Sequence, residues 1–425
     1  MVAVSIFGAL TGMPILIWLT LEPFGVRFGS IAFLVLSVGQ LAGILGMVLL
    51  SINLIISARL RLYERFLPGF NVLYGYHHTI GGLALVLLLI HPVALAFSAV
   101  GGSFSQILFL FLPSQELSVL FGQLALGLLL VLLIITLYIK LPYEWWRLSH
   151  MLLGIPLLLA SMHVFLIPSD VARSLGLKYF LLGLAIIGLV SYFYRTVLGH
   201  WLIKRYNYVI GSVRNLGEIT EITAKPVGVA IPFEPGQYAF IKIKGLGFSF
   251  ETHPFSFSAS PTATGEVRFS AKNLGDYTKD LKKIKEGARM TLEGGYGTFT
   301  IRNIKKARQV WVAGGIGVTP FLSMAGDMGG EQTEVFYCVN DWSEAVYAEE
   351  LRELARKNSN LRVQVWNSRE RGRITGRDIA KQVTDISARD ILLCGPVSMM
   401  DALQDQLRTL GVNPASIHTE AFAIR

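Results

Sequence analysis

The chain is short of charge, and the shortage is confined to one half. Charged residues make up 16% of the 425 residues, against about 25% in an ordinary soluble protein. Residues 1–200 contain 14 charged positions (7%), whereas residues 201–425 contain 53 (about 24%). These proportions exclude a wholly soluble enzyme, a disordered chain and a protein made only of membrane helices.

Cysteine is scarce, and basic clusters are missing. The two cysteines, Cys338 and Cys394, lie far apart in the charged half and form neither a disulfide framework nor a zinc-site spacing. Free thiols favour a reducing cytosol for this half. The net charge is +9, but no Lys/Arg cluster with interleaved aromatics stands out, so nucleic acid is not an expected partner. The N-terminus lacks the positive segment of a secretory signal, so we expect the first apolar run to be a retained helix.

Six apolar runs reach the length of about 20 residues that crosses a bilayer. In hydrocarbon the backbone must satisfy its own hydrogen bonds, so we expect helices in contact with membrane lipid. The runs lie near residues 2–21, 31–56, 76–100, 117–138, 145–167 and 173–198. Eight basic residues follow the second, fourth and sixth runs: Arg59, Arg61, Arg65, Lys140, Arg147, Arg195, Lys204 and Arg205. The opposite ends carry only three: Arg27, Arg173 and Lys178. This asymmetry predicts a six-pass protein of the plasma membrane with its charged half in the cytoplasm.

Five of the eight histidines fall on two of these runs: His77, His78 and His91 on the third, His150 and His163 on the fifth. Polar rings inside a membrane helix are costly and are usually functional. His77 and His91 are 14 residues apart, about 21 Å along a helix. His150 and His163 are 13 apart, about 19.5 Å by the same rise. Because both helices run outward from the cytoplasm, the spacing predicts one pair at an inner level and one at an outer level.

Two facing pairs at two depths can hold two haems, each with imidazole on both axial positions. No Cys-x-x-Cys-His motif occurs, so such haems are expected to be b-type and non-covalent. A spacing of 14 returns to nearly the same helix face at about 100° per residue, whereas 13 does not. Pro156 lies between His150 and His163 and is a residue type that distorts helices. The alternative is that the four histidines only form hydrogen bonds between helices.

Residues 201–304 alternate β-branched and aromatic residues with Gly/Pro turns, as in a small antiparallel barrel. The run 253–256, His-Pro-Phe-Ser, offers hydroxyls and backbone amides beside aromatic faces, which suit a flavin ring. Taken alone, it is equally consistent with a strand edge and turn. At 275–278, a glycine turn opens a helix, where backbone N–H groups and the Thr278 hydroxyl could cradle a pyrophosphate.

From residue 305 onward strands alternate with helices, which indicates a parallel α/β sheet. The strand 309–313 leads into the glycine turn 314–320, which is not a Gly-x-Gly-x-x-Gly fingerprint but still offers a place for a dinucleotide phosphate. The strand 390–393 leads into a second turn at Cys394-Gly395-Pro396. After a further strand, Ser368, Arg369 and Arg373 favour NADPH, because guanidinium groups bind a 2′-phosphate. NADH stays possible, since an Arg-rich loop is often only a solvated face.

The run Tyr143-Glu144-Trp145-Trp146-Arg147-Leu148-Ser149-His150, followed by His163, resembles the fifth helix of the ferric reductase/NADPH oxidase superfamily. The third helix of that superfamily is resembled by His77, Gly81 and His91. The resemblance implies that His77 with His150, and His91 with His163, ligate two stacked haems. We expect His78 to be a neighbour of the inner haem or an interfacial residue rather than a ligand.

The charged half is similar to ferredoxin–NADP reductase-type dehydrogenases. One departure is the family's Gly-Pro-Tyr-Gly turn, which is Gly294-Gly295-Tyr296-Gly297 here. The closing Glu420-Ala421-Phe422 resembles the family's C-terminal segment, which implies that Phe422 covers the flavin with Glu420 nearby. The resemblance also implies flavin contacts from His253, Pro254, Phe255 and Ser256, and diphosphate contacts from Gly275 and Thr278. It implies dinucleotide contacts from Gly314, Gly315, Gly317 and Pro320, with Cys394 and Gly395 near the nicotinamide.

These features predict a three-domain oxidoreductase. Its parts are a six-helix transmembrane haem bundle (residues 1–200), an antiparallel β-barrel FAD domain (201–304) and an α/β parallel-sheet NAD(P)-binding domain (305–425). Electrons are expected to pass from cytosolic NADPH or NADH through FAD and two b-type haems to an external acceptor. No side chain is needed as nucleophile or general acid, and no obligate protein partner is evident.

Ferric iron is the acceptor that the sequence favours. Leu95 stands where NADPH oxidases of animals and plants commonly carry a further histidine, and the external connections are short. Oxygen, reduced to superoxide, is the alternative acceptor. No calcium-binding loop of EF-hand spacing occurs. A third hypothesis is a transporter or proton pathway with a nucleotide-sensing lobe, which predicts no haem.

Overall fold

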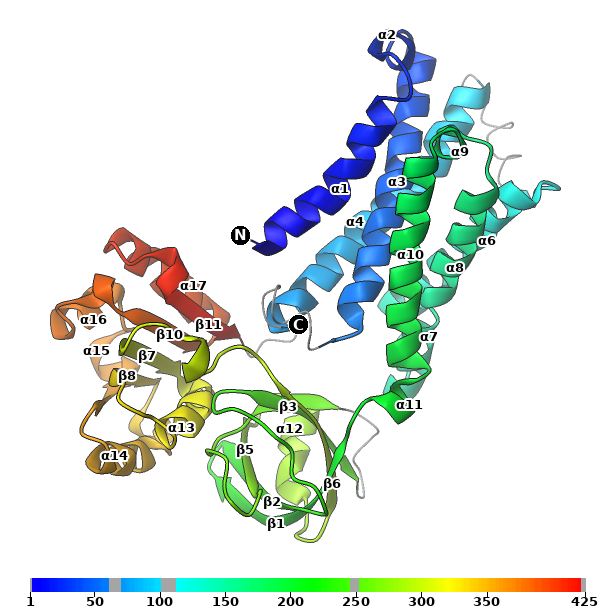
Figure 1. Cartoon of the computed structure of the whole chain (residues 1–425). Coiled ribbons are helices and arrows are strands. Elements are labelled where there is room, and N and C mark those ends of the chain that lie inside the picture. The colour runs from blue at the N-terminus through cyan, green and yellow to red at the C-terminus, as the bar shows by residue number, and fades with distance from the viewer. Residues whose placement is uncertain (1, 61–69, 101–111, 245–251, 422–425) are drawn as a thin grey trace. The chain divides into compact units, whose positions relative to one another are not determined.

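The computed structural model describes residues 2–60, 70–100, 112–244 and 252–421. The chain divides into two compact units, residues 1–68 with 72–203, and residues 204–425 with 69–71. The first is a helical bundle and the second contains two sheets (Figure 1). The boundary between the two units, at residues 203–204, coincides with the change from the charge-poor half of the sequence to the half with an ordinary proportion of charged residues.

Helices occupy all six apolar runs. The long elements are α1 (Val2–Leu19), α3 (Ile31–Ser57), α4 (Phe70–Val100), α6 (Leu117–Tyr138), α7 (Tyr143–Met151) with α8 (Gly154–Leu166), and α10 (Leu175–Thr196). Five spans, 31–57, 75–98, 117–138, 145–166 and 175–196, are long and apolar enough to cross a membrane. The first run is shorter within its described part, Ser5–Leu19, so the described residues give five spans rather than the six expected.

Helix α3 forms the centre of the bundle. Half of its membrane window is buried, against 17–33% for the other four spans, and it packs against α1, α8 and α10. Close approach is possible because glycines face the neighbouring helices. A Cβ at Gly46 would lie 2.8 Å from the Leu88 side chain of α4, and one at Gly188 of α10 would lie 3.0 Å from the Ser51 carbonyl.

The fifth span is interrupted between α7 and α8. Around Leu152 and Leu153 the backbone bonds tighten: the Leu153 N–H reaches the His150 carbonyl (3.2 Å) and the Ile155 N–H reaches the Leu152 carbonyl (2.9 Å). Pro156 has no N–H to restore the regular bond to Leu152. Gly154 provides room at the break, since a Cβ there would lie 2.5 Å from the ring of Tyr192 in α10.

The second unit begins with a six-stranded antiparallel sheet of order β4-β3-β6-β1-β2-β5. Its strands are β1 (Tyr206–Leu216), β2 (Ile219–Pro226), β3 (Tyr238–Lys244), β4 (His253–Ser256), β5 (Val267–Lys272) and β6 (Arg289–Tyr296). An antiparallel bridge between Phe257 and Phe269 joins the chain after β4 to β5, the two edge strands. The sheet therefore curls into the predicted barrel around a core that includes Tyr208, Ile241 and Leu292.

A five-stranded parallel sheet of order β11-β10-β7-β8-β9 follows. Its strands are β7 (Arg308–Gly314), β8 (Gln332–Val339), β9 (Leu361–Asn367), β10 (Asp390–Gly395) and β11 (Ile417–Ala421). Helices α13 (Thr319–Ala325) and α14 (Ala348–Lys357) cover one face, and α16 (Gly376–Gln382) and α17 (Val397–Thr409) cover the other (Figure 1). This is the expected parallel α/β architecture.

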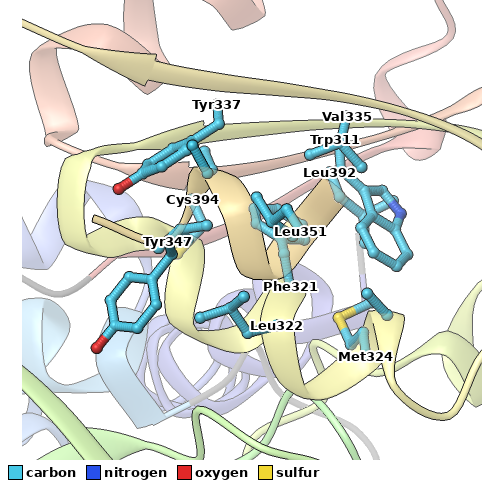
Figure 2. Close-up of a cluster of buried hydrophobic side chains, with 14 of the residues drawn as sticks. Trp311, Phe321, Leu322, Met324, Val335, Tyr337, Tyr347, Leu351, Leu392 and Cys394 are labelled. Carbon is cyan, nitrogen blue, oxygen red and sulfur yellow. The ribbon is translucent and has the colours of Figure 1, made fainter. Parts of the chain in front are cut away.

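Side chains of the central strands point alternately into the two hydrophobic cores, one on each face of the parallel sheet. Trp311 points into the core under α13 and α14, where it stacks on Phe321 with ring centroids 5.3 Å apart (Figure 2). Val310 and Val312 point into the opposite core. Because successive side chains of a strand face opposite sides, a sheet covered on both faces reads as a continuous apolar run, as residues 310–313 do.

Candidate functional site

The four membrane histidines lie in two facing pairs. His77 of α4 and His150 of α7 have ring centroids 5.9 Å apart, and His91 of α4 and His163 of α8 have centroids 6.3 Å apart. Two metal–nitrogen bonds of about 2 Å, with each ring centre a little over about 1 Å further out, place two axial imidazole centroids about 6 Å apart. The spacing of both pairs therefore fits an iron atom between the rings.

Backbone carbonyls set the tautomer of the outer pair. His91 Nδ1 lies 2.8 Å from the Gly39 carbonyl oxygen, and His163 Nδ1 lies 2.6 Å from the Ser118 carbonyl oxygen. A carbonyl can only accept, so each Nδ1 carries the proton and each Nε2 keeps its lone pair for a metal. This arrangement is the usual outer support of a metal-binding histidine.

A glycine one turn beyond each carbonyl makes room for the ring. A Cβ at Gly43 of α3 would lie 2.6 Å from His91 Nδ1, and a Cβ at Gly122 of α6 would lie 2.9 Å from His163 Nδ1. The sequence argument did not identify Gly39, Gly43, Ser118 or Gly122. Their signal is small-x-x-x-small spacing in two apolar helices, Gly39 with Gly43 and Ser118 with Gly122.

The inner pair has different support. The Trp146 ring is parallel to that of His150, 5.4 Å away, and its Nε1 donates to the Thr136 carbonyl at 3.0 Å. His78 lies edge-on to His77, with centroids 5.9 Å apart, and is thus a neighbour of the inner pair. A Cβ at Gly81 would lie 2.9 Å from the Asn53 amide nitrogen, so this glycine admits a buried polar side chain beside the inner pair.

The break in the fifth span brings His150 and His163 onto one side. At about 100° per residue, 13 residues of unbroken helix would turn their side chains roughly 140° apart. The tightened backbone at Leu152 and Leu153 changes this rotation, and both rings meet partners on the single helix α4. Pro156, which the sequence indicated as a possible source of helix distortion, lies close to this break.

In the barrel, the run expected to bind flavin forms β4 and pairs with β3. The His253 ring stacks on Tyr277 of α12 (Asp276–Asp280), with centroids 3.8 Å apart, and Phe255 lies 6.4 Å from the same ring. The Thr278 hydroxyl accepts from the N–H groups of Leu274 and Gly275, each at 3.0 Å. The same hydroxyl donates to the Gly275 carbonyl at 3.0 Å, and the diphosphate contacts expected of Gly275 and Thr278 stay predictions.

The two glycine turns of the parallel sheet touch each other. Gly315 and Gly317 follow β7, Gly395 ends β10, and these are neighbouring strands. A Cβ at Gly395, where φ is +158°, would lie 2.9 Å from the Gly314 Cα. Pro320 is buried in the first turn of α13. The carboxyl ends of neighbouring parallel strands, one on each side of a switch in strand order, are where dinucleotides bind.

Cys394 and Glu420 lie side by side on β10 and β11. Both are buried, and burial, followed by the nearby Glu420 charge, raises the pKa of the Cys394 thiol well above its usual range. The thiol is therefore neutral at physiological pH and is not a nucleophile. Phe422, expected over the flavin, lies outside the described residues.

The basic loop after β9 is already partly paired. Arg369 Nη1 lies 2.6 Å from Asp341, which follows β8. Hydrogen bonds from the Ser343 backbone and hydroxyl, followed by the Arg369 charge, lower the pKa of Asp341. Ser368 opens the short helix α15 (Ser368–Arg371), and Arg373 is exposed two residues beyond it. The residues predicted to bind the 2′-phosphate therefore lie beside the Asp341 carboxylate, which is already paired with Arg369.

Comparison with known families accounts for most of the chain. Residues 42–161 match the family described as ferric reductase like transmembrane component. Residues 212–315 match an FAD-binding domain, and residues 311–405 match an oxidoreductase NAD-binding domain. The chain belongs to the ferric reductase/NADPH oxidase superfamily.

Relatives of this superfamily member confirm the dehydrogenase half. The toluate 1,2-dioxygenase electron transfer component of Pseudomonas putida is 30% identical over 235 residues, which cover 51% of this chain and 68% of that protein. The propane 2-monooxygenase reductase component of Mycolicibacterium goodii is 28% identical, over 48% of this chain and 64% of its own length. The chain thus spans about two thirds of these relatives.

A solved structure of flavohemoglobin from Malassezia yamatoensis, with bound FAD and heme, has a similar fold. Its TM-score is 0.52 at 16% identity, covering 82% of this chain and 88% of that one. Together the matches establish the ferric reductase-family protein as a membrane-embedded, NAD(P)H-dependent flavin oxidoreductase, as the sequence predicted.

Proposed function

We propose that the protein carries electrons from cytosolic NADPH, through FAD and two b-type haems, to ferric iron on the outer side of the plasma membrane. The observation that carries this proposal is the two facing histidine pairs in a ferric reductase-like domain, each spaced for an axially bound metal. Interhelical hydrogen bonding alone does not account for them, because His91 and His163 use Nδ1 on backbone carbonyls and still face each other with ring centroids 6.3 Å apart.

His77 with His150 would hold the inner haem, and His91 with His163 the outer one. When bound, FAD and haem would supply hydride acceptance and one-electron transfer, which no protein side chain offers. The chain's own part is to hold and orient: α4 contributes one ring to each pair, and the carbonyls of Gly39 and Ser118 fix the outer rings. A separation of 14 residues along α4 places the two levels about 21 Å apart.

The flavin and nucleotide would bind the second unit. The β4 run 253–256 and the turn at Gly275 support the FAD assignment, and the touching turns at Gly315, Gly317 and Gly395 support the NAD(P) assignment. Ser368, Arg369 and Arg373 favour NADPH through the 2′-phosphate. NADH is the alternative donor, because Asp341 offers a carboxylate partner to a free 2′-hydroxyl.

Charged and aromatic residues support the proposed membrane orientation. Basic residues gather in the connections after the second, fourth and sixth apolar runs, which supports a cytoplasmic dehydrogenase half. Exposed aromatic rings stand near span ends, as at interfaces: Tyr138, Trp145 and Trp201 at the basic end, and Tyr179 at the other. The first helix, α1, is proposed as the sixth span.

The choice of acceptor rests on Leu95. This side chain lies one turn beyond His91 and contacts the Gly39 position of α3, so an apolar group occupies a place near the outer pair. The external connections are also short in sequence. The competing activity is the reduction of oxygen to superoxide, which is measured in the same experiment as ferric reduction.

An absorption spectrum of the purified protein tests the haems. We expect a Soret band that shifts on reduction by dithionite, and its absence would contradict the electron-transfer proposal in favour of a haem-free pathway. NADPH turnover with and without a ferric chelate, with superoxide followed in parallel, then assigns the acceptor. Turnover that needs the chelate supports ferric reduction, and turnover that yields superoxide without it overturns that assignment.

A further inference from the structure

A partly buried cluster of charged and polar side chains joins the barrel to the parallel-sheet lobe. The barrel contributes Glu221 from β2 and Arg268 and Ser270 from β5, and the other lobe contributes Tyr347 and Glu350 at the start of α14. Glu221, Ser270 and Tyr347 are each no more than 4% exposed. We call these five residues the seam cluster.

Arg268 and Glu350 form the strongest contact of the seam cluster. The guanidinium donates to both carboxylate oxygens, at 2.6 and 3.1 Å, which is the two-bond geometry that restricts orientation as well as distance. Arg268 also donates from Nε to the Ser258 carbonyl at 3.1 Å, so the guanidinium is held by its own lobe before it meets α14.

Tyr347 makes the second crossing contact. Its hydroxyl lies 3.2 Å from Glu221 Oε2 and 2.7 Å from Ser270 Oγ. A carboxylate can only accept, so Tyr347 donates to Glu221. Arg214 (3.2 Å) and Arg268 (3.7 Å) neutralise Glu221 from the barrel side. Arg268–Glu350 is thus an ion pair that crosses the seam, while Glu221 is paired within the barrel and accepts the hydrogen bond from Tyr347 of the other lobe.

Stability alone is a poor explanation for this arrangement. Removing charges from water costs several kcal/mol per ion, and apolar residues of similar volume are often as stable. What a charged, directional network adds is one preferred geometry, because every partner must keep its angle and distance. If the seam only had to hold the two lobes together, apolar side chains such as the leucines and valines of the adjoining core would suffice.

The seam lies next to both cofactor motifs. Ser258 follows the flavin run by two residues, and β5 leads within three residues of Lys272 to the turn at Gly275. A reciprocal pair continues the seam: Ser260 Oγ donates to the Ser323 carbonyl (2.6 Å) and Ser323 Oγ donates to the Ala259 carbonyl (3.1 Å). Ser323 belongs to α13, which begins directly after the glycine turn of β7.

We propose that the seam cluster is a positioning device that fixes the nucleotide-binding turns against the flavin motif for hydride transfer. The proposal rests on the proposed function. The step moves one hydride, two electrons with a proton, from the dihydronicotinamide ring to the flavin ring and leaves the oxidised nucleotide. Misplacement of reacting atoms by about 1 Å can cost about a hundredfold in rate, so interlobe geometry matters even far from the rings.

Glu350→Gln in the full-length, flavin-loaded protein tests this. The variant keeps the side-chain shape but removes the charge that holds Arg268. We expect the limiting rate of flavin reduction by NADPH, measured by stopped flow, to fall about tenfold, with the apparent Kd for NADPH changed less than about twofold. The matched control is Glu349→Gln, since Glu349 is 62% exposed and, among the described residues, its ion pairs are with Arg352 and Arg356 of its own helix.

Hydrogen exchange supplies a readout that does not depend on turnover. In Glu350→Gln, amides of β5 and α14 should exchange faster in the absence of nucleotide, whereas Glu349→Gln should match the unmodified protein. Tyr347→Phe should also speed exchange of these amides and slow flavin reduction. In the double variant the fold-change should be smaller than the product of the two single fold-changes, because both substitutions loosen the same contact between the lobes. If Glu350→Gln does not fold, Tyr347→Phe carries the test.

Three results would overturn the proposal: an unchanged reduction rate, unchanged exchange at the seam, or loss of bound flavin, which would make the cluster a support of the flavin site itself. Failure of the proposed function is distinguishable. If neither NADPH nor NADH reduces the unmodified protein, the assigned activity is wrong, while the exchange comparison still reports whether the seam cluster holds the lobes.

Discussion

Alanine at position 43 should displace the ring of His91. Gly43 faces that ring from α3, and an added Cβ would lie 2.6 Å from Nδ1 and 2.8 Å from Cε1. Ordinary contacts begin at about 3.4 Å, so the ring must move by about 0.8 Å. Because metal–ligand distances are held to about 0.2 Å, a shift of this size is incompatible with an axial bond. The same shift weakens the 2.8 Å hydrogen bond from His91 to the Gly39 carbonyl.

The expected result of Gly43→Ala is loss of one haem of two, with the flavin retained. Gly122→Ala should act on the same haem through His163, but less strongly, because its Cβ would lie 2.9 Å from the ring and require a shift of only about 0.5 Å. The assay is the ratio of haem, measured as the pyridine haemochrome, to FAD and to protein. Reductive titration then reports which of the two potentials disappears.

Gly127→Ala is the matched control on α6. A Cβ there meets nothing within 4 Å, and alanine in a helix is favoured over glycine by about 1 kcal/mol, so this variant should be neutral or slightly more stable. Loss of haem in Gly43→Ala therefore cannot be a general effect of alanine in the bundle. Two haems with unchanged spectra in both Gly43→Ala and Gly122→Ala would refute the assignment of His91 and His163 as a ligand pair.

Three further predictions follow from local geometry. Pro156→Ala restores an N–H at the helix break, so we expect a more regular fifth span and reduced haem content, and full haem content would show that the break does not depend on this residue. Asp341→Asn frees Arg369 from its carboxylate and should raise the ratio of kcat/KM for NADPH over NADH about fivefold, and an unchanged ratio would separate this loop from the 2′-phosphate. Burial raises the pKa of the Cys338 thiol to about 12 and also raises that of the Cys394 thiol well above its usual range. At pH 8 only about one Cys338 thiol in ten thousand is then ionised, so iodoacetamide should label both cysteines only after denaturation, and rapid native labelling would contradict their burial.

The fold was largely predictable because each part has a strong periodic or compositional signal. Scarce charge marks the helical unit, alternation marks the barrel, and the continuous apolar run 310–313 marks a sheet covered on both faces. The described residues contain five spans, so the sixth span, at α1, stays a prediction.

The support of the histidines was not predictable from composition. Gly43 and Gly122 function through contact with rings that lie 48 and 41 positions further along the sequence, and a single sequence carries no trace of such pairing beyond small-residue spacing. The Arg369–Asp341 pair escaped notice for the same reason, since its members end different strands. Residue types therefore identify candidate ligands, while their partners depend on helix packing and strand order.

The fifth span shows how a mismatch in a pattern can itself carry information. Thirteen residues between His150 and His163 do not fit one face of a regular helix, whereas fourteen between the partners on α4 do. Both rings can face α4 only if the fifth span loses its regular rotation between them. The backbone departs from α-helical bonding at Leu152 and Leu153, just before Pro156, and Gly154 lets Tyr192 fill the space that opens. The spacing of 13 residues and Pro156 thus belong together, because a local break in the fifth span aligns both of its histidines with their partners on α4.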